Sequence, residues 1–165
     1  MNNNHQNDDD NFYLTEEGYQ AKESKLKDLR HELYEEIPEK LKEAKAHEGD
    51  LRENKEFIYL RERQDRIQAE ISRLEHLLDN ATIIDQKELQ SDLVSMGTKV
   101  ILEEEGQRDA VTYTLVSPAE ADLEKNKISV ESPVGEALMG HHQGEEITVQ
   151  TPSGEKVYRI LGIGK

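Results

Sequence analysis

The first half of the chain contains two long stretches in which apolar residues recur every three or four positions. In residues 15–47 these residues are Tyr19, Leu26, Leu29, Leu33, Ile37, Leu41 and Ala44. In residues 50–80 they are Leu60, Ile67, Ile71, Leu74 and Leu78, with Gln64 as the one polar position in the series. This spacing predicts two amphipathic helices. Because a short Gly-containing turn separates them, they predict an antiparallel coiled-coil hairpin.

The ends and the middle of the first helix carry their own signals. Thr15 is a suitable N-cap, and Glu16 and Glu17 follow it near the positive end of the helix. Pro38 lies inside the helical run. Since proline lacks an N–H group and its ring clashes with the preceding turn, we expect a kink or a local break there.

The pattern changes near residue 82, where β-branched residues and turn signals replace the helical spacing. Strands are predicted at residues 98–103, 111–117, 127–131, 146–151 and 156–163. Thr151-Pro152-Ser153-Gly154 is typical of a hairpin connection, and Ser132-Pro133 predicts a short helix that runs to about Met139. We therefore expect an α+β protein with a polar, disordered tail at 1–11, a hairpin at 12–82, a linker at 83–93 and an antiparallel sheet domain with a short helix at 94–165.

Composition limits the possible functions. Only 34% of the 165 residues are apolar, which suits a long hairpin with little core. The absence of cysteine excludes a disulfide scaffold, a thiolate zinc site and a cysteine nucleophile. No apolar run is long enough to span a membrane and the N-terminus is polar, so we expect a cytoplasmic protein with no membrane partner. The net charge of −15 argues against broad, non-specific nucleic-acid binding.

The turn between the predicted helices has two interpretations. In the first, Gly49 ends the first helix, Asp50 caps the second, and Glu53 completes a capping box three residues later. In the second, the same turn presents two carboxylates at the far end of a long stalk, where they can share a divalent cation or a water molecule. Two carboxylates are too few to hold Mg²⁺ alone. Such a pair would therefore act inside another protein's metal site.

Three segments together resemble one known family. AKAHEGDLRENKEF resembles the hairpin tip of the bacterial GreA/GreB transcript-cleavage factors, in which G-D-L-x-E-N-x-E-[YF] is characteristic. SPVGEALMGHHQGEEITVQTPSGEKVYRI resembles the C-terminal signature of that family, and LTEEGYQAKESKLKDL resembles the start of its first helix. Pro38 matches a common family proline. The resemblance extends over about residues 13–163, with GreA as the nearest branch.

The resemblance implies a fold and a function. The coiled coil would enter the secondary channel of bacterial RNA polymerase, and an FKBP-like C-terminal domain would grip the channel rim without prolyl isomerase activity. Asp50 and Glu53 would be the catalytic pair that holds a weakly bound Mg²⁺ jointly with the polymerase, near the 3′ end of the nascent RNA. The polymerase would then cleave backtracked RNA and rescue arrested complexes. The protein would be a monomeric catalytic cofactor, not an enzyme, and would meet DNA only through the elongation complex.

Two other functions stay open. Phe57 stands where the family often has Tyr, and His141 stands where a Lys or Arg is frequent. Some family relatives keep the shape but inhibit transcription, so a channel-binding inhibitor or modulator without cleavage activity is one alternative. A coiled-coil adaptor or chaperone-like protein, whose tip is only a capped turn, is the other.

The second helix carries positive charge along one flank of its apolar seam. The residues are Arg52, Lys55, Arg63, Arg66 and Arg73. This flank either faces RNA or an acidic channel wall, or pairs with glutamates of the first helix as coiled-coil flanks do. Tyr19, Tyr34 and Tyr59 are predicted to pack in the seam rather than to stack on bases. The sequence contains no Ser/His/Asp motif, phosphate loop or dinucleotide fingerprint.

Overall fold

The computed structural model describes residues 11–46 and 49–164, and these residues form two compact units. The first unit comprises Tyr19–Asn80. The second, called the C-terminal unit below, comprises Asn11–Gly18 together with Ala81–Lys165, so it includes the first turn of the first helix. Most of the predicted tail at 1–11 lies outside the described residues. The exception is Asn11, whose side-chain oxygen accepts a hydrogen bond from Thr82 Oγ1 at 2.7 Å.

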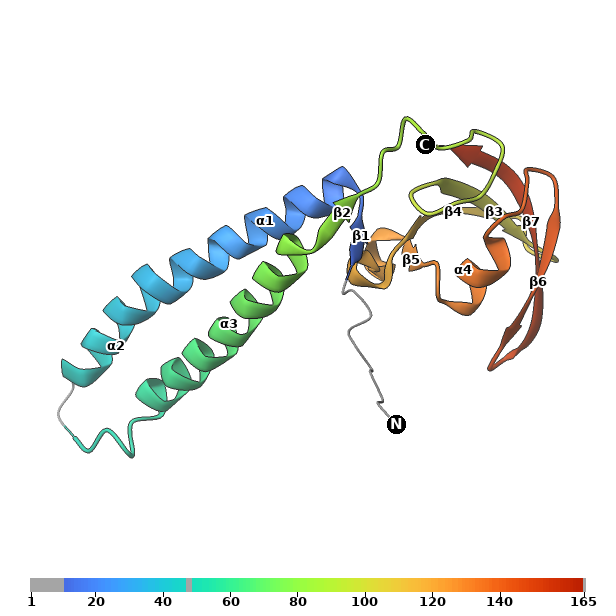
Figure 1. Cartoon of the computed structure of the whole chain (residues 1–165). Coiled ribbons are helices and arrows are strands. Elements are labelled where there is room, and N and C mark those ends of the chain that lie inside the picture. The colour runs from blue at the N-terminus through green and yellow to red at the C-terminus, as the bar shows by residue number, and fades with distance from the viewer. Residues whose placement is uncertain (1–10, 47–48, 165) are drawn as a thin grey trace, which may run out of the picture. The chain divides into compact units, whose positions relative to one another are not determined.

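The first unit is the predicted helical hairpin (Figure 1). Its first arm consists of α1 (Glu16–His31), a π-helical turn η1 (Glu32–Glu36) and α2 (Ile37–Ala46), and its second arm is α3 (Lys55–Asp79). The break expected near Pro38 takes the form of the π-helical turn directly before it. There the Ile37 N–H donates to the Glu32 carbonyl five residues back, so the chain enters the proline through a widened turn.

One line of apolar side chains joins the two arms. The buried members are Leu26, Leu29, Leu33, Ile37, Ile67, Ile71 and Leu74, with Leu41 and Leu78 packed against them. Ion pairs flank this seam, including Arg30 with Glu75 and Lys25 with Glu70. The prediction of seam packing is wrong for Tyr34 and Tyr59, which are 64% and 58% exposed and lie outside the buried seam.

The second unit contains a curled five-stranded sheet in the order β5-β4-β3-β7-β6. The strands are β3 (Lys99–Glu104), β4 (Ala110–Val116), β5 (Lys127–Ser129), β6 (Glu146–Thr151) and β7 (Gly154–Gly164). All neighbours are antiparallel except β4 and β5. Two 3₁₀ turns, η2 (Pro118–Glu120) and η3 (Leu123–Lys125), carry the chain back before β5 begins, so the sheet is mixed and not entirely antiparallel as predicted.

The helix α4 (Pro133–Leu138) covers the core of this sheet and is capped as predicted, because Ser132 Oγ accepts from Gly135 N at 3.1 Å. The buried core consists of Val94, Val100, Leu102, Leu115, Ile128, Leu138, Ile147, Val149 and Ile160. Alternation of buried and exposed residues along β3 and β6 places one face of the sheet on this core.

Two short strands were not predicted. β1 (Phe12–Leu14) and β2 (Ala81–Ile83) form a parallel pair, and the chain enters α1 directly after one strand and leaves α3 directly before the other. Thr15 follows β1 and caps α1 as predicted, accepting from Gly18 N at 3.0 Å. None of the helices in the described part of the chain is long and apolar enough to cross a membrane.

Candidate catalytic tip and flanking surfaces

The hairpin tip is a tight turn fixed by backbone contacts. Gly49 has a φ of 141°, a conformation that L side chains rarely adopt. The Asp50 carbonyl accepts from Glu53 N at 3.0 Å, and Asp50 Oδ1 accepts from Arg52 N at 3.0 Å. Asp50 therefore closes a turn over residues 51–53 with both its backbone and its side chain. His47 and Glu48 lie outside the described residues.

The predicted capping box of Asp50 and Glu53 is wrong, because α3 starts later than the sequence suggested. Its N-cap is Asn54, whose side-chain oxygen accepts from Phe57 N at 3.0 Å. The Asn54 amide nitrogen also donates to the Ala44 carbonyl at 3.0 Å, which ties the end of α2 to the start of α3. Asparagine caps a helix as well as aspartate does, and only asparagine supplies this additional donor.

Freed from capping α3, the two tip carboxylates are available for other contacts. Asp50 and Glu53 are both exposed, and Arg52 between them is exposed too. The Glu53 carboxylate makes no hydrogen bond or ion pair within residues 11–46 and 49–164. In that same part of the chain no group of three or more His, Cys, Asp or Glu side chains could hold a metal ion. The tip thus offers hard oxygen ligands that suit Mg²⁺, but too few to complete its coordination.

Arg63 follows the interhelical interpretation of the basic flank. Its Nε lies 2.8 Å from Glu32 Oε1 and its terminal nitrogen 2.9 Å from Glu32 Oε2, a bidentate pair across the hairpin. The side chains are 35% and 27% exposed. The hydrogen bond from Arg63 holds the pKa of the Glu32 carboxyl below its usual range. Arg63 is therefore committed to holding the arms together beside the π-helical turn.

The remaining four basic residues are exposed and make fewer or longer contacts within the chain than Arg63 does. Arg66 Nη1 lies 3.9 Å from Glu62 Oε2 on the same helix, and Arg73 Nε donates to the Ala69 carbonyl at 3.4 Å. The side chains of Arg52 and Lys55 make no ion pair among the described residues.

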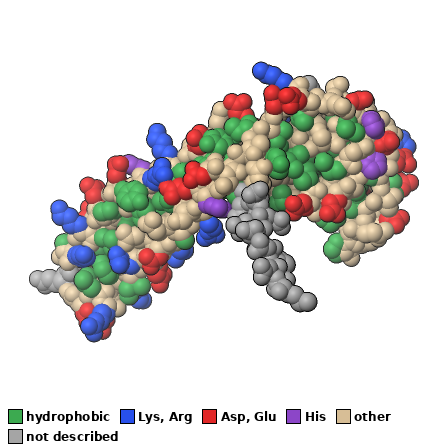
Figure 2. Space-filling model, in the orientation of Figure 1, with side chains coloured by type: hydrophobic (Ala, Val, Ile, Leu, Met, Phe, Trp, Pro, Cys, Tyr) green, Lys and Arg blue, Asp and Glu red, His purple; other side chains and the backbone are tan. Residues whose placement is uncertain are grey.

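An open groove of about 460 Å³ runs along α3, lined by Arg63, Arg66, Glu70, Arg73, Leu74 and Leu77. Figure 2 shows Lys and Arg interspersed with Asp and Glu along the helical arm, so the positive flank is local. Arg63 also lines this groove, but it differs from the four exposed cations because it is paired with Glu32 across the hairpin.

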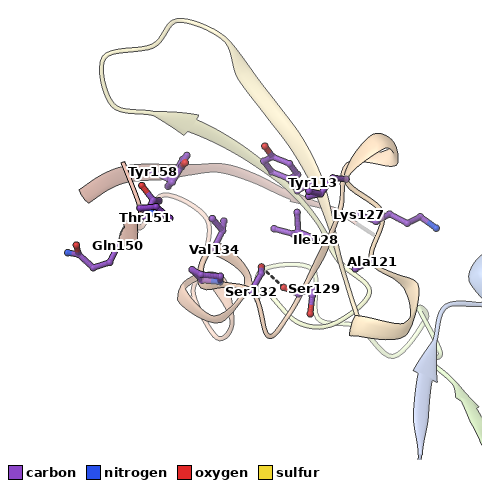
Figure 3. A pocket seen from close by; sticks show the side chains of 13 residues that line it. Tyr113, Ala121, Lys127, Ile128, Ser129, Ser132, Val134, Gln150, Thr151 and Tyr158 are labelled. Carbon is purple, nitrogen blue, oxygen red and sulfur yellow. Dashed lines mark hydrogen bonds between the residues drawn. The ribbon is translucent and has the colours of Figure 1, made fainter. Parts of the chain in front are cut away.

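A second candidate surface, which the sequence reasoning missed, is an apolar pocket in the C-terminal unit (Figure 3). Its volume is about 400 Å³, and its apolar lining includes Tyr113, Ile128, Pro133, Val134, Pro152 and Tyr158. Burial raises the pKa of the Tyr158 hydroxyl. The segment Ser132–Val134 supplies one wall and begins the family-like C-terminal motif. That motif was the only available signal, because local pattern does not show which side chains will surround a cavity.

The chain matches two family models that together extend over nearly its whole length. Residues 12–83 match the model described as "Transcription elongation factor, N-terminal", and residues 89–165 match "Transcription elongation factor, GreA/GreB, C-term". A transcription elongation factor GreA from Chloroherpeton thalassium is 42% identical over 154 residues, which is 93% of this chain and 97% of the relative. One from Chlorobium phaeobacteroides is 44% identical over 155 residues, with the same coverage.

The crystal structure of GreA factor homolog 1 from Thermus thermophilus is 29% identical, with coverage of 94% of this chain and 99% of that one and a TM-score of 0.42.

Proposed function

The chain belongs to the GreA/GreB family of transcription elongation factors, and from this premise we propose that it stimulates cleavage of backtracked nascent RNA by bacterial RNA polymerase. On this proposal the hairpin enters the polymerase secondary channel and brings its tip to the RNA 3′ end. The protein has no hydrolytic centre of its own in the proposal, because the polymerase supplies the active site and the factor supplies two carboxylates.

The observation that carries this proposal is the state of Asp50 and Glu53. Both are exposed at the turn that joins the arms, and neither caps α3, since Asn54 does that. Folding of the hairpin therefore does not require their charge. Two exposed acids on a tightly hydrogen-bonded turn suit a role toward a partner, because the turn restricts where the carboxylates can lie before binding.

Mg²⁺ fits this donor set only as a shared ion. Carboxylate oxygens are the ligands that Mg²⁺ prefers, and two of them leave most of an octahedral shell to water, substrate phosphate and the polymerase. When bound there, the ion would help to ionise the attacking water. The contribution of this chain is to hold Asp50 and Glu53 on one turn, with Asp50 Oδ1 oriented by Arg52 N.

The basic flank and the apolar pocket would attach the factor to the elongation complex. We assign Arg52, Lys55, Arg66 and Arg73 to contacts with the RNA 3′ end or an acidic channel wall, because they are exposed, whereas Arg63 is paired across the hairpin. Reversal of charge at Arg66 should raise the factor concentration needed for cleavage and make that concentration less sensitive to salt, because one attractive charge contact is lost. Unchanged cleavage at several salt concentrations would contradict this assignment.

The apolar pocket of the C-terminal unit suits a protein contact on the channel rim, because its lining is mostly aromatic and aliphatic. On this proposal, an apolar side chain of the polymerase would enter between Tyr113, Val134 and Tyr158. Val134→Asp should then weaken binding of the factor to core polymerase without changing the hairpin. Equal affinity of this variant and the wild type would contradict the assignment.

A stalled, backtracked elongation complex tests the main proposal. Incubation with this protein and Mg²⁺ should shorten the RNA from its 3′ end faster than Mg²⁺ alone, as seen on a denaturing gel. The alternative, a channel-binding inhibitor or modulator of the same fold, predicts that the protein binds the polymerase but does not accelerate cleavage. The same gel therefore separates the two functions once binding has been measured independently.

A further inference from the structure

Glu120 is a carboxylate that the proposed chemistry does not use, yet it is almost fully buried. Its side chain is 4% exposed and lies at the end of the 3₁₀ turn η2. A buried carboxylate is costly unless it is paired and hydrogen-bonded. Its contacts therefore indicate which part of the structure the buried carboxylate stabilises.

Three donors surround the Glu120 carboxylate, and two of them come from Thr15. Thr15 N donates to Oε2 at 2.9 Å and Thr15 Oγ1 donates to Oε1 at 2.6 Å. Lys127 Nζ lies 3.0 Å from Oε1 and balances the charge. Thr15 is itself the N-cap of α1, so Glu120 holds the residue that starts the helix. A negative charge at this helix end is also favourable to the helix dipole.

Gly18 allows the close approach of Glu120 to the helix. A Cβ at position 18 would overlap Glu120 Cδ and both carboxylate oxygens. Any larger residue would therefore have to displace the Glu120 side chain. Glycine is needed at position 18 because the carboxylate occupies the space that a side chain would fill. The φ of Gly18 is not positive, so backbone conformation does not require glycine there.

The same region joins the two chain ends of the hairpin. Ile84 N donates to the Leu14 carbonyl at 2.8 Å, which extends the β1–β2 pairing by one more hydrogen bond. Ser117 Oγ donates to the Tyr13 carbonyl at 2.5 Å, so the segment that carries Glu120 also holds β1. The entry to α1 and the exit from α3 are thus both hydrogen-bonded within the C-terminal unit.

We propose that Glu120 is a positioning residue: with Thr15, Gly18 and Lys127 it forms a base clamp that, within the C-terminal unit, fixes the first turn of α1 to the segment 117–127. Because α1 runs without interruption from Glu16 to His31, a fixed first turn restricts the motion of the arm that follows. The consequence for RNA cleavage rests on the proposed function, whereas the clamp itself does not.

The first test needs no polymerase. The chain has no cysteine, so Lys42→Cys on α2 and Thr148→Cys on β6, both exposed, give two clean spin-label sites. Glu120→Gln keeps the shape of the side chain but removes the charge and one acceptor. We expect the distribution of distances between the labels to broaden. Hydrogen exchange at the Gly18 amide should also become about tenfold faster, as loss of a charged hydrogen bond implies.

The matched control is Glu124→Gln, an exposed acid on the neighbouring turn η3. It should leave both the label distances and the amide exchange unchanged. If Glu120→Gln gives the wild-type distance distribution and exchange rate while folded, the clamp proposal is overturned. The circular dichroism spectrum and melting temperature of each variant show that the comparison is made on folded protein.

A second pair of variants tests the contact from the other side. Gly18→Ala should place a methyl group against the Glu120 carboxyl and speed exchange of the first turn of α1. In a Glu120→Ala background the space is empty, so adding Gly18→Ala should have little further effect. Such non-additivity is expected only if the two residues act through their mutual contact. Additive effects would contradict the clamp.

The cleavage assay then tests the functional consequence. With Glu120→Gln we expect the cleavage rate at saturating factor to fall by about tenfold, while the factor concentration for half-maximal effect stays within about twofold. A normal rate would overturn the positioning role even if the clamp exists. If the wild-type protein itself does not stimulate cleavage, the proposed function fails, and the label and exchange measurements still decide whether Glu120 is a clamp.

Discussion

The hairpin and the C-terminal unit achieve stability in different ways. In the hairpin, one line of apolar side chains joins the arms, and charged residues cover the other faces. In the C-terminal unit, one face of the curled five-stranded sheet packs with α4 around a contiguous core. The difference shows how the hairpin can be long although the chain is only 34% apolar. It also leaves the hairpin tip outside the apolar packing, where Asp50 and Glu53 are exposed.

The largest expected effect comes from removing one side chain of the seam. Ile67 is fully buried, and Ile67→Ala should lower the free energy of unfolding of the hairpin by about 3 kcal/mol. Because the two units have separate cores, the C-terminal unit should keep its stability. Hydrogen exchange with mass spectrometry, read separately for α3 and β7, measures this.

Ile160→Ala is the matched variant in the other unit, since Ile160 is also fully buried. It should increase exchange in the sheet and leave the hairpin protected. If either variant loosened both units equally, the two cores would have to be treated as one cooperative structure.

The next effect concerns the ion pair between Glu32 and Arg63. Glu32→Gln should cost about 1–2 kcal/mol, because a charged bidentate contact is lost and Arg63 is left half-buried without its partner. The folded-state pKa of Glu32 is depressed, so its stabilising contribution is present above the unfolded pKa. That contribution disappears as pH falls through the folded-state pKa.

A pH series of urea unfolding curves checks this prediction. The difference in stability between wild type and Glu32→Gln should be constant near neutral pH and shrink below about pH 4.5. Glu62→Gln, which removes the exposed partner of Arg66, is the control and should cost much less at any pH. A difference that persists unchanged to about pH 3 would show that the Glu32 charge does not stabilise the fold.

The smallest effect distinguishes the residue that caps α3 from the residues at the tip. Asn54→Ala should cost about 1 kcal/mol, because it removes both the cap and the bond to the Ala44 carbonyl. Asp50→Ala should cost clearly less, since its side chain accepts only from the exposed turn. Urea midpoints of the two variants give the comparison, and an equal loss in both would restore the original capping-box interpretation.

Local signals in the sequence predicted much of this fold. The spacing of Leu26, Leu29 and Leu33 predicted the seam, and Ser132-Pro133 predicted the start of α4. These predictions succeeded because burial in a helix or strand follows a regular spacing that can be seen within a short stretch of sequence.

Long-range contacts were not predicted. The β1–β2 pair joins Phe12 to Ala81, and the Glu120 carboxylate binds Thr15 from 105 positions away. No local pattern marks such partners, and Glu120 sits in a polar segment typical of a surface loop. The α3 cap was misassigned for a different reason: Asp50 and Asn54 cap helices equally well, and only the turn over residues 51–53 decides between them.

The central claim is that the tip carboxylates act in a partner's magnesium site and are not needed for folding. Its most direct test is the Asp50→Asn, Glu53→Gln double variant, measured against wild type in cleavage of a backtracked elongation complex at saturating factor and Mg²⁺. The amide oxygen that Asp50→Asn introduces can still accept from Arg52 N, so the melting temperature should stay within about 2 °C of wild type. We predict that stimulation of cleavage falls at least about 100-fold. Cleavage equal to wild type by a folded, polymerase-bound double variant would contradict the claim.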